Sequence, residues 1–242
     1  MYKNKKILGL IPARGGSRGI PRKNIKSLQG KPLIAYSIET ALKVRFIDKV
    51  IVSSEDEGII KIAKKYGAQV PFVRPQNLAE DHSPTFGVLE HACTFLRTQL
   101  NEEYDYLCLL EPTAPLRTVQ DVEKAIALLI NTRGAEAVVG ISETIAFHPS
   151  VIFSMNKRCF LKKVFNDIEL GRRQELTRFF YPNAALYISE MKTLLNKKSF
   201  YHTKTIGYLM PKYRSIEIDE PEDFLINEAI LNYGIDKFKA VT

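Results

Sequence analysis

Short, almost continuously apolar runs alternate along the chain with longer segments whose apolar residues recur every three or four positions. The continuous runs cover residues 7–12, 50–53, 106–110 and 137–141, and a further extended segment covers 70–73. Runs of this kind are typical of strands buried on both faces of a parallel sheet. The periodic segments predict helices over residues 32–43, 57–66, 85–100, 119–131 and 222–233. This alternation predicts a doubly wound α/β fold of the Rossmann type, with helices on both faces of a mostly parallel sheet.

The pattern changes between about residues 148 and 210, where the segments become shorter and the pairs Asn-Lys, Asn-Asp and Pro-Asn interrupt them. We expect a small β-rich insertion here that covers the site. The sequence contains no repeat, low-complexity tract or long linker, so residues 1–242 are predicted to form a single domain.

Composition supports a folded protein and excludes several classes. Hydrophobic residues make up 45% of the 242 residues and charged residues 26%, which is enough for a substantial core. No apolar run reaches the roughly 18 to 20 residues that span a bilayer, and the first residues lack a signal-peptide pattern. We therefore expect a cytoplasmic protein with no membrane partner. The three cysteines form no C-x-x-C pair, so neither a disulfide framework nor a zinc cluster is indicated.

Positive charge is concentrated at the start of the chain. The formal net charge is +8, and the first acidic residue is Glu39. The cations that precede it are Lys3, Lys5, Lys6, Arg14, Arg18, Arg22, Lys23, Lys26 and Lys31. A nucleic acid would account for this charge, but no aromatic residues are interleaved with the basic stretch, and an adjacent Gly-Gly pair indicates a compact phosphate ligand instead. We expect no nucleic-acid partner.

The loop at residues 12–24 combines glycines and cations in the way that a triphosphate requires. Gly15, Gly16 and Gly19 let backbone N–H groups approach an anion, while the four basic side chains of the loop neutralise it. The alternative is a solvated basic loop. The same stretch fits the hydrolase pattern G-x-S-x-G around Ser17, but its position after the first strand, amid cations, argues against that interpretation.

This loop resembles the signature of the CMP-sialic acid synthetases, also called acylneuraminate cytidylyltransferases. Four further blocks of that family follow in order, at residues 74–78, 109–117, 181–188 and 215–219, so the resemblance extends along nearly the whole chain. It implies a fold like that of the nucleotide-diphospho-sugar transferases, and a homodimer with shared active sites to which the insertion contributes. It also implies an activity, the transfer of CMP from CTP to the anomeric hydroxyl of a nine-carbon 2-keto acid sugar with release of pyrophosphate.

The resemblance assigns most of the first loop to the nucleotide. It places Arg14, Ser17 and Lys23 at the triphosphate and Asn24 and Arg74 at the nucleotide, and the backbone of Gly15 and Gly16 completes the predicted nucleotide-binding set. Arg14 and Lys23 are also the catalytic candidates, together with Asp219. Cations that are already in place stabilise the charge that spreads over phosphoryl oxygens in the transition state.

The alternation Ile216-Glu217-Ile218-Asp219 supplies a candidate metal site. On a strand, both carboxylates face one side while both isoleucines face the core. Carboxylate oxygens suit Mg²⁺, the one cofactor that we expect, which would bridge the phosphates. Without the resemblance, half-exposed acids on an edge strand are the alternative interpretation. The family often has Asp at the position of Glu217.

The candidates for the sugar site are Glu111, Arg173, Gln174, Tyr187, Phe200 and Tyr201. Arg173-Gln174 matches a family pair near the acceptor, where Arg173 would hold the sugar carboxylate through two hydrogen bonds. An ordinary surface arginine is the alternative. Phe200-Tyr201 resembles an aromatic pair that members of the family reach across a dimer interface to the sugar. The alternative is that both rings belong to the core.

Two departures from the family pattern leave the sugar open. Glu111 stands where sialic-acid enzymes usually carry Gln, which exchanges a hydrogen-bond donor for an acceptor, and Tyr181 stands where Arg is common. The acceptor is therefore N-acetylneuraminate or a related sugar such as legionaminate or pseudaminate. Rival interpretations are a nucleotidyltransferase for Kdo or for a sugar 1-phosphate and, from another class, a basic RNA-binding protein. The general base is open between a sugar hydroxyl with a metal-lowered pKa and Asp219 acting through water.

Overall fold

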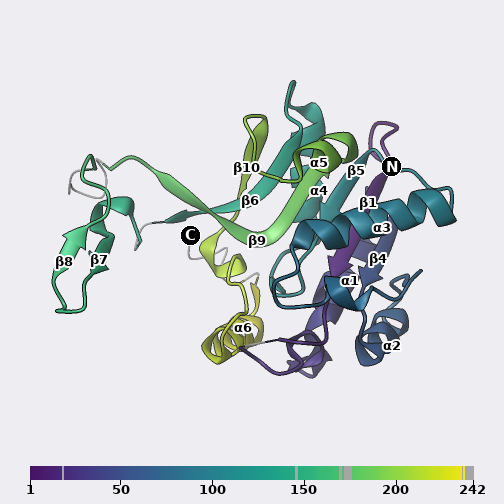
Figure 1. The fold of residues 1–242 in the computed structure, drawn as a ribbon, viewed down its shortest axis with the longest axis horizontal. Coiled ribbons are helices and arrows are strands. Elements are labelled where there is room, and N and C mark those ends of the chain that lie inside the picture. Colours follow the sequence, from purple (N-terminus) through teal and green to yellow (C-terminus); the bar gives the residue numbers. More distant parts are fainter. Residues whose placement is uncertain (18, 145–146, 169–170, 172–175, 236, 238–242) are drawn as a thin grey trace.

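A six-stranded sheet forms the centre of the molecule. The computed structural model describes residues 1–242 except 18, 145–146, 169–170, 172–175, 236 and 238–242. The strand order is β10-β6-β9-β5-β1-β4 (Figure 1). The strands are β1 (Ile7–Pro12), β4 (Lys49–Ser53), β5 (Tyr106–Leu109), β6 (Ala137–Thr144), β9 (Phe179–Glu190) and β10 (Thr205–Leu209). Strand β9 runs antiparallel to β5 and β6, and the other neighbours are parallel, which confirms the expected mostly parallel sheet.

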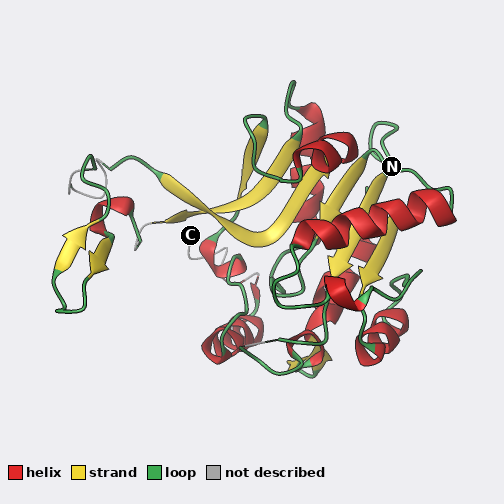
Figure 2. Cartoon of the chain, in the orientation of Figure 1, coloured by secondary structure: helices red, strands yellow, loops and turns green. Residues whose placement is uncertain are grey.

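Helices cover both faces of this sheet (Figure 2). One face carries α1 (Leu33–Lys43), α2 (Glu57–Lys65) and α4 (Val119–Asn131), and the other carries α3 (Thr85–Gln99) and α5 (Met191–Lys197). In β1, Ile7 and Ile11 belong to the first core and Leu8 and Leu10 to the second, because successive strand side chains point to opposite faces. None of the described helices combines the length and apolar character that crossing a membrane requires.

The last helix, α6 (Pro221–Tyr233), closes a smaller third core. Its Phe224 packs with Leu28 from the short strand β2 (Ser27–Leu28) and with Ile218. Strand β2 pairs with β3 (Lys31–Pro32). Single turns of 3₁₀ helix lie at Lys23–Ile25, Gln76–Leu78, Pro149–Val151 and Lys212–Arg214. This third core places the segment before α6 against the loop that follows β1.

Helix ends follow the signals in the sequence. The side chain of Asp56 caps α2 by accepting a hydrogen bond from the backbone N–H of Ile59 at 2.8 Å. Gly67, which follows the other end of α2, has a φ of +91°, which glycine adopts without strain. Thr118 and Asp121 form a reciprocal capping box at the start of α4.

A hairpin of β7 (Phe153–Met155) and β8 (Leu161–Lys163) lies apart from the body of the molecule in Figure 1. It belongs to a segment that we call the arm, residues 147–168. The arm exposes large apolar side chains, with exposed fractions of 76% for Phe147, 66% for Met155, 68% for Phe160 and 64% for Leu161. Large contiguous apolar patches are rare on the surface of soluble monomers.

The expected β-rich insertion at residues 148–210 is too long. Strand β9, helix α5 and strand β10 all belong to the central layers, so the segment that leaves the body ends before β9. The pair Pro182-Asn183 led to this error, because such a pair is typical of the end of a short segment. It lies within β9, where the register against β6 shifts between Val139 and Ile141 of β6. A strand that bulges in this way loses its regular alternation.

Two expected extended segments are not strands. Residues 70–73 are preceded by one isolated bridge, between Gln69 and Ile51, and do not continue it. Residues 216–219 are irregular, because the backbone N–H of Ile218 donates to the carbonyl of Thr113, in a loop, at 2.7 Å instead of joining a ladder.

Candidate active site

A cavity of about 600 Å³ opens beyond the carboxyl ends of the central strands. Pro12, the last residue of β1, and Glu111, which follows β5, both line it. Of the predicted nucleotide and catalytic residues, the ones that line this cavity are Arg14, Ser17, Lys23, Asn24, Arg74 and Asp219. The sequence blocks at residues 12–24, 74–78, 109–117 and 215–219 therefore meet at one place, as expected for ligands of α/β sheets.

The loop after β1 is held by hydrogen bonds to its own end and to neighbouring acids. The side-chain amide of Asn24 donates to the carbonyl of Arg14 at 2.9 Å. The Arg14 guanidinium pairs with Asp81 across the cavity mouth. The backbone N–H of Gly15, expected to bind phosphate, donates to the carboxylate of Glu55 at 2.6 Å. An incoming triphosphate would compete with Asp81 for the Arg14 guanidinium, since both residues line the cavity.

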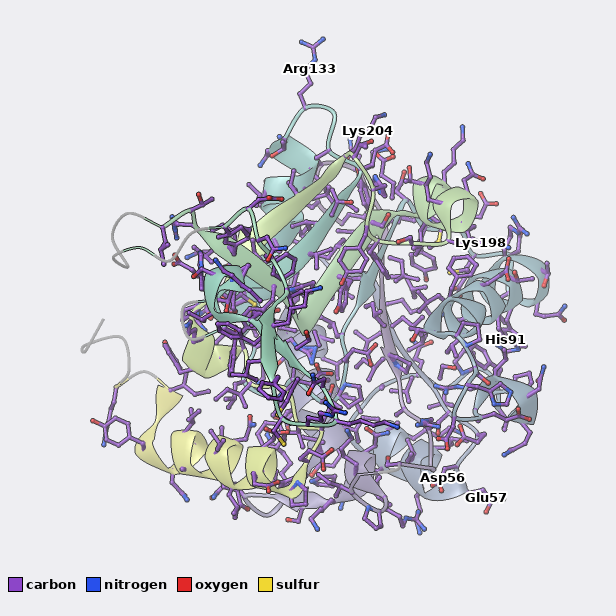
Figure 3. The ribbon with its side chains drawn as sticks, turned by 60° about the vertical axis from the view of Figure 1, so that its left-hand side comes forward. Asp56, Glu57, His91, Arg133, Lys198 and Lys204 are labelled. Atoms are coloured by element: carbon purple, nitrogen blue, oxygen red, sulfur yellow. The ribbon has the colours of Figure 1, made fainter. Side chains whose placement is uncertain are left out.

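Two of the loop glycines are required by close packing. A Cβ on Gly15 would lie 2.8 Å from the Asp56 carboxylate. That carboxylate is held in place by its capping hydrogen bond to α2. Asp56 is labelled in Figure 3 at the start of this helix. A Cβ on Gly19 would lie 2.5 Å from the backbone oxygen of Asp219. By contrast, nothing lies within 4 Å of a Cβ on Gly16. Neither Gly15 nor Gly16 is among the described residues that line the cavity.

Lys23 joins this loop to the segment before α6. Its ammonium group donates to the carbonyl of Ile218 at 2.7 Å and to the carboxylate of Asp219 at 3.0 Å. The lysine side chain is 14% exposed and that of Asp219 is 64% exposed, so the pair stands at the cavity wall with the acid toward solvent. A cation in this position can reach a phosphate in the cavity.

Arg74 is anchored at the end of β4. Its guanidinium is buried and donates to the hydroxyl of Ser53 at 3.1 Å and to the carbonyl of the same residue. Burial lowers the pKa of Arg74, and the carboxylate of Glu55, 4.0 Å away, opposes that shift. The side chain is therefore a rigid part of the wall.

A second cavity, of about 350 Å³, adjoins the first. Of the predicted sugar and metal residues, it is lined by Glu111, Tyr187, Phe200, Tyr201 and Glu217. The ring of Tyr187 lies 5.3 Å from that of Phe200 and 6.3 Å from that of Tyr201, between ring centroids. Burial, and a hydrogen bond with Tyr201, raise the pKa of Tyr187, so this phenol stays protonated.

The aromatic pair Phe200-Tyr201 lines the second cavity of the chain to which it belongs. Phe200 is also a member of the core under α3 and α5, so the alternative interpretation of that ring holds as well, whereas Tyr201 is 55% exposed. Lys198, labelled in Figure 3 at the end of α5, lines the same cavity, with its ammonium 5.6 Å from the ring centroid of Phe86. Lys198 carries no local pattern that would have identified it from the sequence.

Glu217 and Asp219 stand on the two sides of the junction between the cavities. Glu217 lines the second cavity and accepts a hydrogen bond from the Thr113 hydroxyl at 2.9 Å, while Asp219 lines the first. Burial raises the pKa of Glu217, and the negative charge of Asp219 adds to the shift. Two carboxylates placed so that the charge of one acts on the other are a fitting pair for a divalent cation.

Within the described ranges, no group of three or more His, Cys, Asp and Glu side chains could hold a metal ion. Any ion held by Glu217 and Asp219 would therefore need further oxygens from elsewhere. Mg²⁺ is commonly bound in this way, by one or two carboxylates together with substrate phosphates and water.

Asn183 is a structural residue that the sequence did not single out. Its buried amide donates to the hydroxyls of Ser142 and Ser215 at 3.1 and 3.0 Å, and its oxygen accepts from the backbone N–H of Ala185 at 3.2 Å. A Cβ on Gly140 would lie 2.6 Å from that oxygen. The block at 181–188 thus positions the segment that carries Glu217 and Asp219, while Tyr181 is exposed on β9 and lines neither cavity. The predicted Arg173 and Gln174 lie outside the described residues.

The fold and the paired cavities define a class of protein, a doubly wound α/β protein with a nucleotide-sized cavity beside a smaller one. Comparison with known proteins specifies it further. The chain belongs to the cytidylyltransferase family, whose model matches residues 8–236, and it is therefore an enzyme that transfers CMP from CTP. This excludes the interpretation as an RNA-binding protein of another class.

Individual relatives agree with that family. The chain is 34% identical to the pseudaminic acid cytidylyltransferase of Campylobacter jejuni, over 90% of this chain and 93% of the relative. It is 33% identical to the CMP-N,N'-diacetyllegionaminic acid synthase of Legionella pneumophila, over 93% and 96%. Its fold resembles that of a CMP:2-keto-3-deoxy-manno-octonic acid synthetase solved with CTP, with a TM-score of 0.68, 19% identity and coverage of 94% and 99%.

Proposed function

We propose that this enzyme transfers CMP from CTP to the anomeric hydroxyl of a nine-carbon 2-keto acid sugar, releasing pyrophosphate. The observation that carries the proposal is the second cavity, walled by aromatic rings, which shares Glu111 with the nucleotide cavity. Its volume of about 350 Å³ suits one monosaccharide. The names of the relatives add support, since two of them act on sugars of this class.

The chain's own cations would stabilise the transfer. The sugar oxygen attacks the α-phosphorus in line, and negative charge develops on the phosphoryl oxygens and the leaving pyrophosphate. Lys23 is already held at the cavity wall by its bond to Ile218, so it stabilises this charge without reorganising. Arg14 would exchange Asp81 for the triphosphate when CTP binds.

A magnesium ion would be held by Glu217 and Asp219 together with phosphate oxygens. When bound, Mg²⁺ supplies positive charge that neutralises the phosphates. Asp219 now bonds Lys23, so the carboxylate would be shared between the lysine and the ion. Glu217 is held by Thr113 and keeps one carboxylate oxygen for other partners.

The sugar would bind by apolar contact and by hydroxyl groups. Phe86, Leu89 and Phe200 offer apolar walls to the acyl and deoxy groups of such a sugar. The hydroxyls of Tyr187, Ser199 and Tyr201 offer hydrogen bonds, which discriminate between sugars more strongly than apolar contacts do.

We also propose a homodimer in which the arm of each chain packs on the other. The supporting observation is the exposed apolar surface of Phe147, Met155, Phe160 and Leu161. Replacing both Phe160 and Leu161 by Asp would then shift the sedimentation coefficient from that of a dimer to that of a monomer. A monomeric wild-type protein at micromolar concentration would refute the dimer.

Pyrophosphate release tests the proposed reaction. The enzyme is assayed with CTP, UTP, ATP and GTP against pseudaminate, legionaminate, N-acetylneuraminate, Kdo and a sugar 1-phosphate. We expect turnover with CTP and at least one of the three nine-carbon acids. Turnover confined to Kdo or to the sugar 1-phosphate would overturn the proposed acceptor and leave the family assignment intact.

A further inference from the structure

The two cavities meet at Glu111. Of the described residues, only Thr85 and Glu111 line both cavities. In the proposed reaction the nucleotide occupies one cavity and the sugar the other, so the attacking hydroxyl must lie at this junction. A group that removes its proton must lie there too, within hydrogen-bond reach.

Only one of these two junction residues can take up a proton near neutral pH. A threonine hydroxyl donates and accepts hydrogen bonds but does not become protonated in water, whereas a carboxylate does. We propose that Glu111 is a catalytic residue, the general base that accepts the proton of the anomeric hydroxyl. This inference rests on the proposed function.

The transfer forms one bond to the α-phosphorus and breaks another. The anomeric oxygen forms a bond to the α-phosphorus of CTP while its O–H bond breaks, and the proton passes to a carboxylate oxygen of Glu111. The bond from the α-phosphorus to the oxygen that bridges to the β-phosphorus breaks, and pyrophosphate leaves with that electron pair. Protonated Glu111 then releases its proton to water.

Buried donors hold the backbone of Glu111 in place. Its carbonyl oxygen accepts a hydrogen bond from the hydroxyl of Ser37 at 3.1 Å and another from the guanidinium of Arg117. Both donors are themselves buried, and Arg117 also bonds the Ser37 hydroxyl at 3.0 Å. The carboxylate therefore projects from a rigid support, as a base that must meet a reacting atom requires.

The charges around Glu111 allow it to change protonation state near neutral pH. Arg117, Arg74 and Lys23 favour its carboxylate, while Glu217 disfavours it. Burial outweighs these charges and raises the pKa of Glu111 to about 7. A base with such a pKa is partly ionised at neutral pH and still holds a proton well enough to remove it from a hydroxyl.

Glu111 is distinct from the two acids assigned to the metal. Asp219 bonds Lys23, and Glu217 bonds Thr113. Among the described residues, no hydrogen bond joins the Glu111 carboxylate to Glu217 or Asp219.

The test is the pH dependence of kcat/KM for wild type, Glu111→Gln, Glu111→Asp and a control, Glu123→Gln, which changes a carboxylate to an amide on α4. For wild type we expect kcat/KM to rise with pH through a step near 7. Glu111→Gln should lower kcat by about 10² to 10⁴-fold and abolish that step, with the Kd for CTP nearly unchanged. Glu111→Asp should retain the step with a lower kcat, and Glu123→Gln should match wild type.

Three outcomes are decisive against the inference. It is overturned if Glu111→Gln keeps a near-normal kcat with its preferred sugar, if the pH step survives in that variant, or if saturating Mg²⁺ restores its rate. The last result would make Glu111 a metal ligand. Failure of wild type to turn over any nine-carbon acid is a different result, since it overturns the proposed function itself.

Discussion

The ammonium group of Lys23 lies 3.0 Å from a carboxylate oxygen of Asp219, 196 residues later in the sequence. This pair joins the loop after β1 to the segment before α6 and forms part of the nucleotide cavity wall. Both residues line the same cavity, so replacing either one should affect catalysis before it affects folding.

Lys23→Ala should lower kcat by at least about 10²-fold, the usual effect of removing one preorganised group that stabilises transition-state charge. The fold should remain intact, because the acid left behind is 64% exposed and keeps its hydration. Steady-state kinetics and thermal unfolding measure the two effects. Lys43→Ala, at the exposed end of α1, is the control for loss of a lysine. A near-normal kcat in folded Lys23→Ala would remove this residue from the mechanism.

Asp219→Asn should abolish turnover at ordinary Mg²⁺ concentrations. The amide is a weaker ligand than the carboxylate. Loss of a residue that only supports a metal ligand already costs about 10 to 100-fold in metal affinity, and loss of the ligand itself should cost at least as much. Any remaining activity should therefore need that much more Mg²⁺, which a titration of rate against Mg²⁺ measures. Glu222→Gln, an exposed acid nearby on α6, is the control and should keep the wild-type requirement. An unchanged Mg²⁺ requirement in Asp219→Asn would place the metal elsewhere.

The order of strands and helices could be predicted because apolar periodicity is a local property of the sequence. The runs at 7–12 and 106–110 and the helix at 119–131 correspond to β1, β5 and α4. The place of β9 could not be predicted. Its partners β5 and β6 lie far away in the sequence, and its bulge hides the alternation.

The nucleotide loop could be predicted for a similar reason, since its glycines and cations are contiguous. The residues that line the second cavity were harder to predict. Glu111 and Tyr187 share a cavity only because β9 runs antiparallel beside β5, and Thr85 and Lys198 reach the same cavity from helices that carry no distinguishing motif. Nothing in the sequence distinguishes Gly15 from Gly16, whereas in the structure Gly15 is closely packed and Gly16 is not.

Gly15→Ala should destabilise the protein and Gly16→Ala should not. The new methyl group at Gly15 would meet the Asp56 carboxylate at 2.8 Å, which cannot move without losing the cap of α2. Overpacking of this kind costs about 1 to 3 kcal/mol. At Gly16 nothing lies within 4 Å of the new methyl, so the free energy of unfolding should change by no more than about 0.5 kcal/mol. Urea unfolding without CTP measures both variants, and equal stabilities would contradict the close approach at Gly15.

The stability that Glu111 contributes to the fold depends on pH. Burial raises the pKa of its carboxyl from an ordinary value of 4.5 to about 7, so the folded protein binds this proton more tightly than the unfolded chain does. The stabilising contribution of the protonated carboxyl is fully present below pH 4.5 and is lost as the pH rises through about 7. Glutamine does not titrate, so the Tm of Glu111→Gln relative to wild type should rise between pH 5 and pH 8.

Thermal unfolding of both proteins at matched pH values measures this difference and cancels the titration of the groups that do not interact with Glu111. Glu123→Gln, whose partner Arg45 lies at the surface, should show a constant difference over the same range. In the opposite trend, the Tm of wild type would rise relative to that of Glu111→Gln as the pH rises. That result would mean that Arg117, Arg74 and Lys23 stabilise the carboxylate by more than its burial costs. The carboxyl would then be ionised well below neutral pH, and the step in kcat/KM near 7 would have to arise from another group.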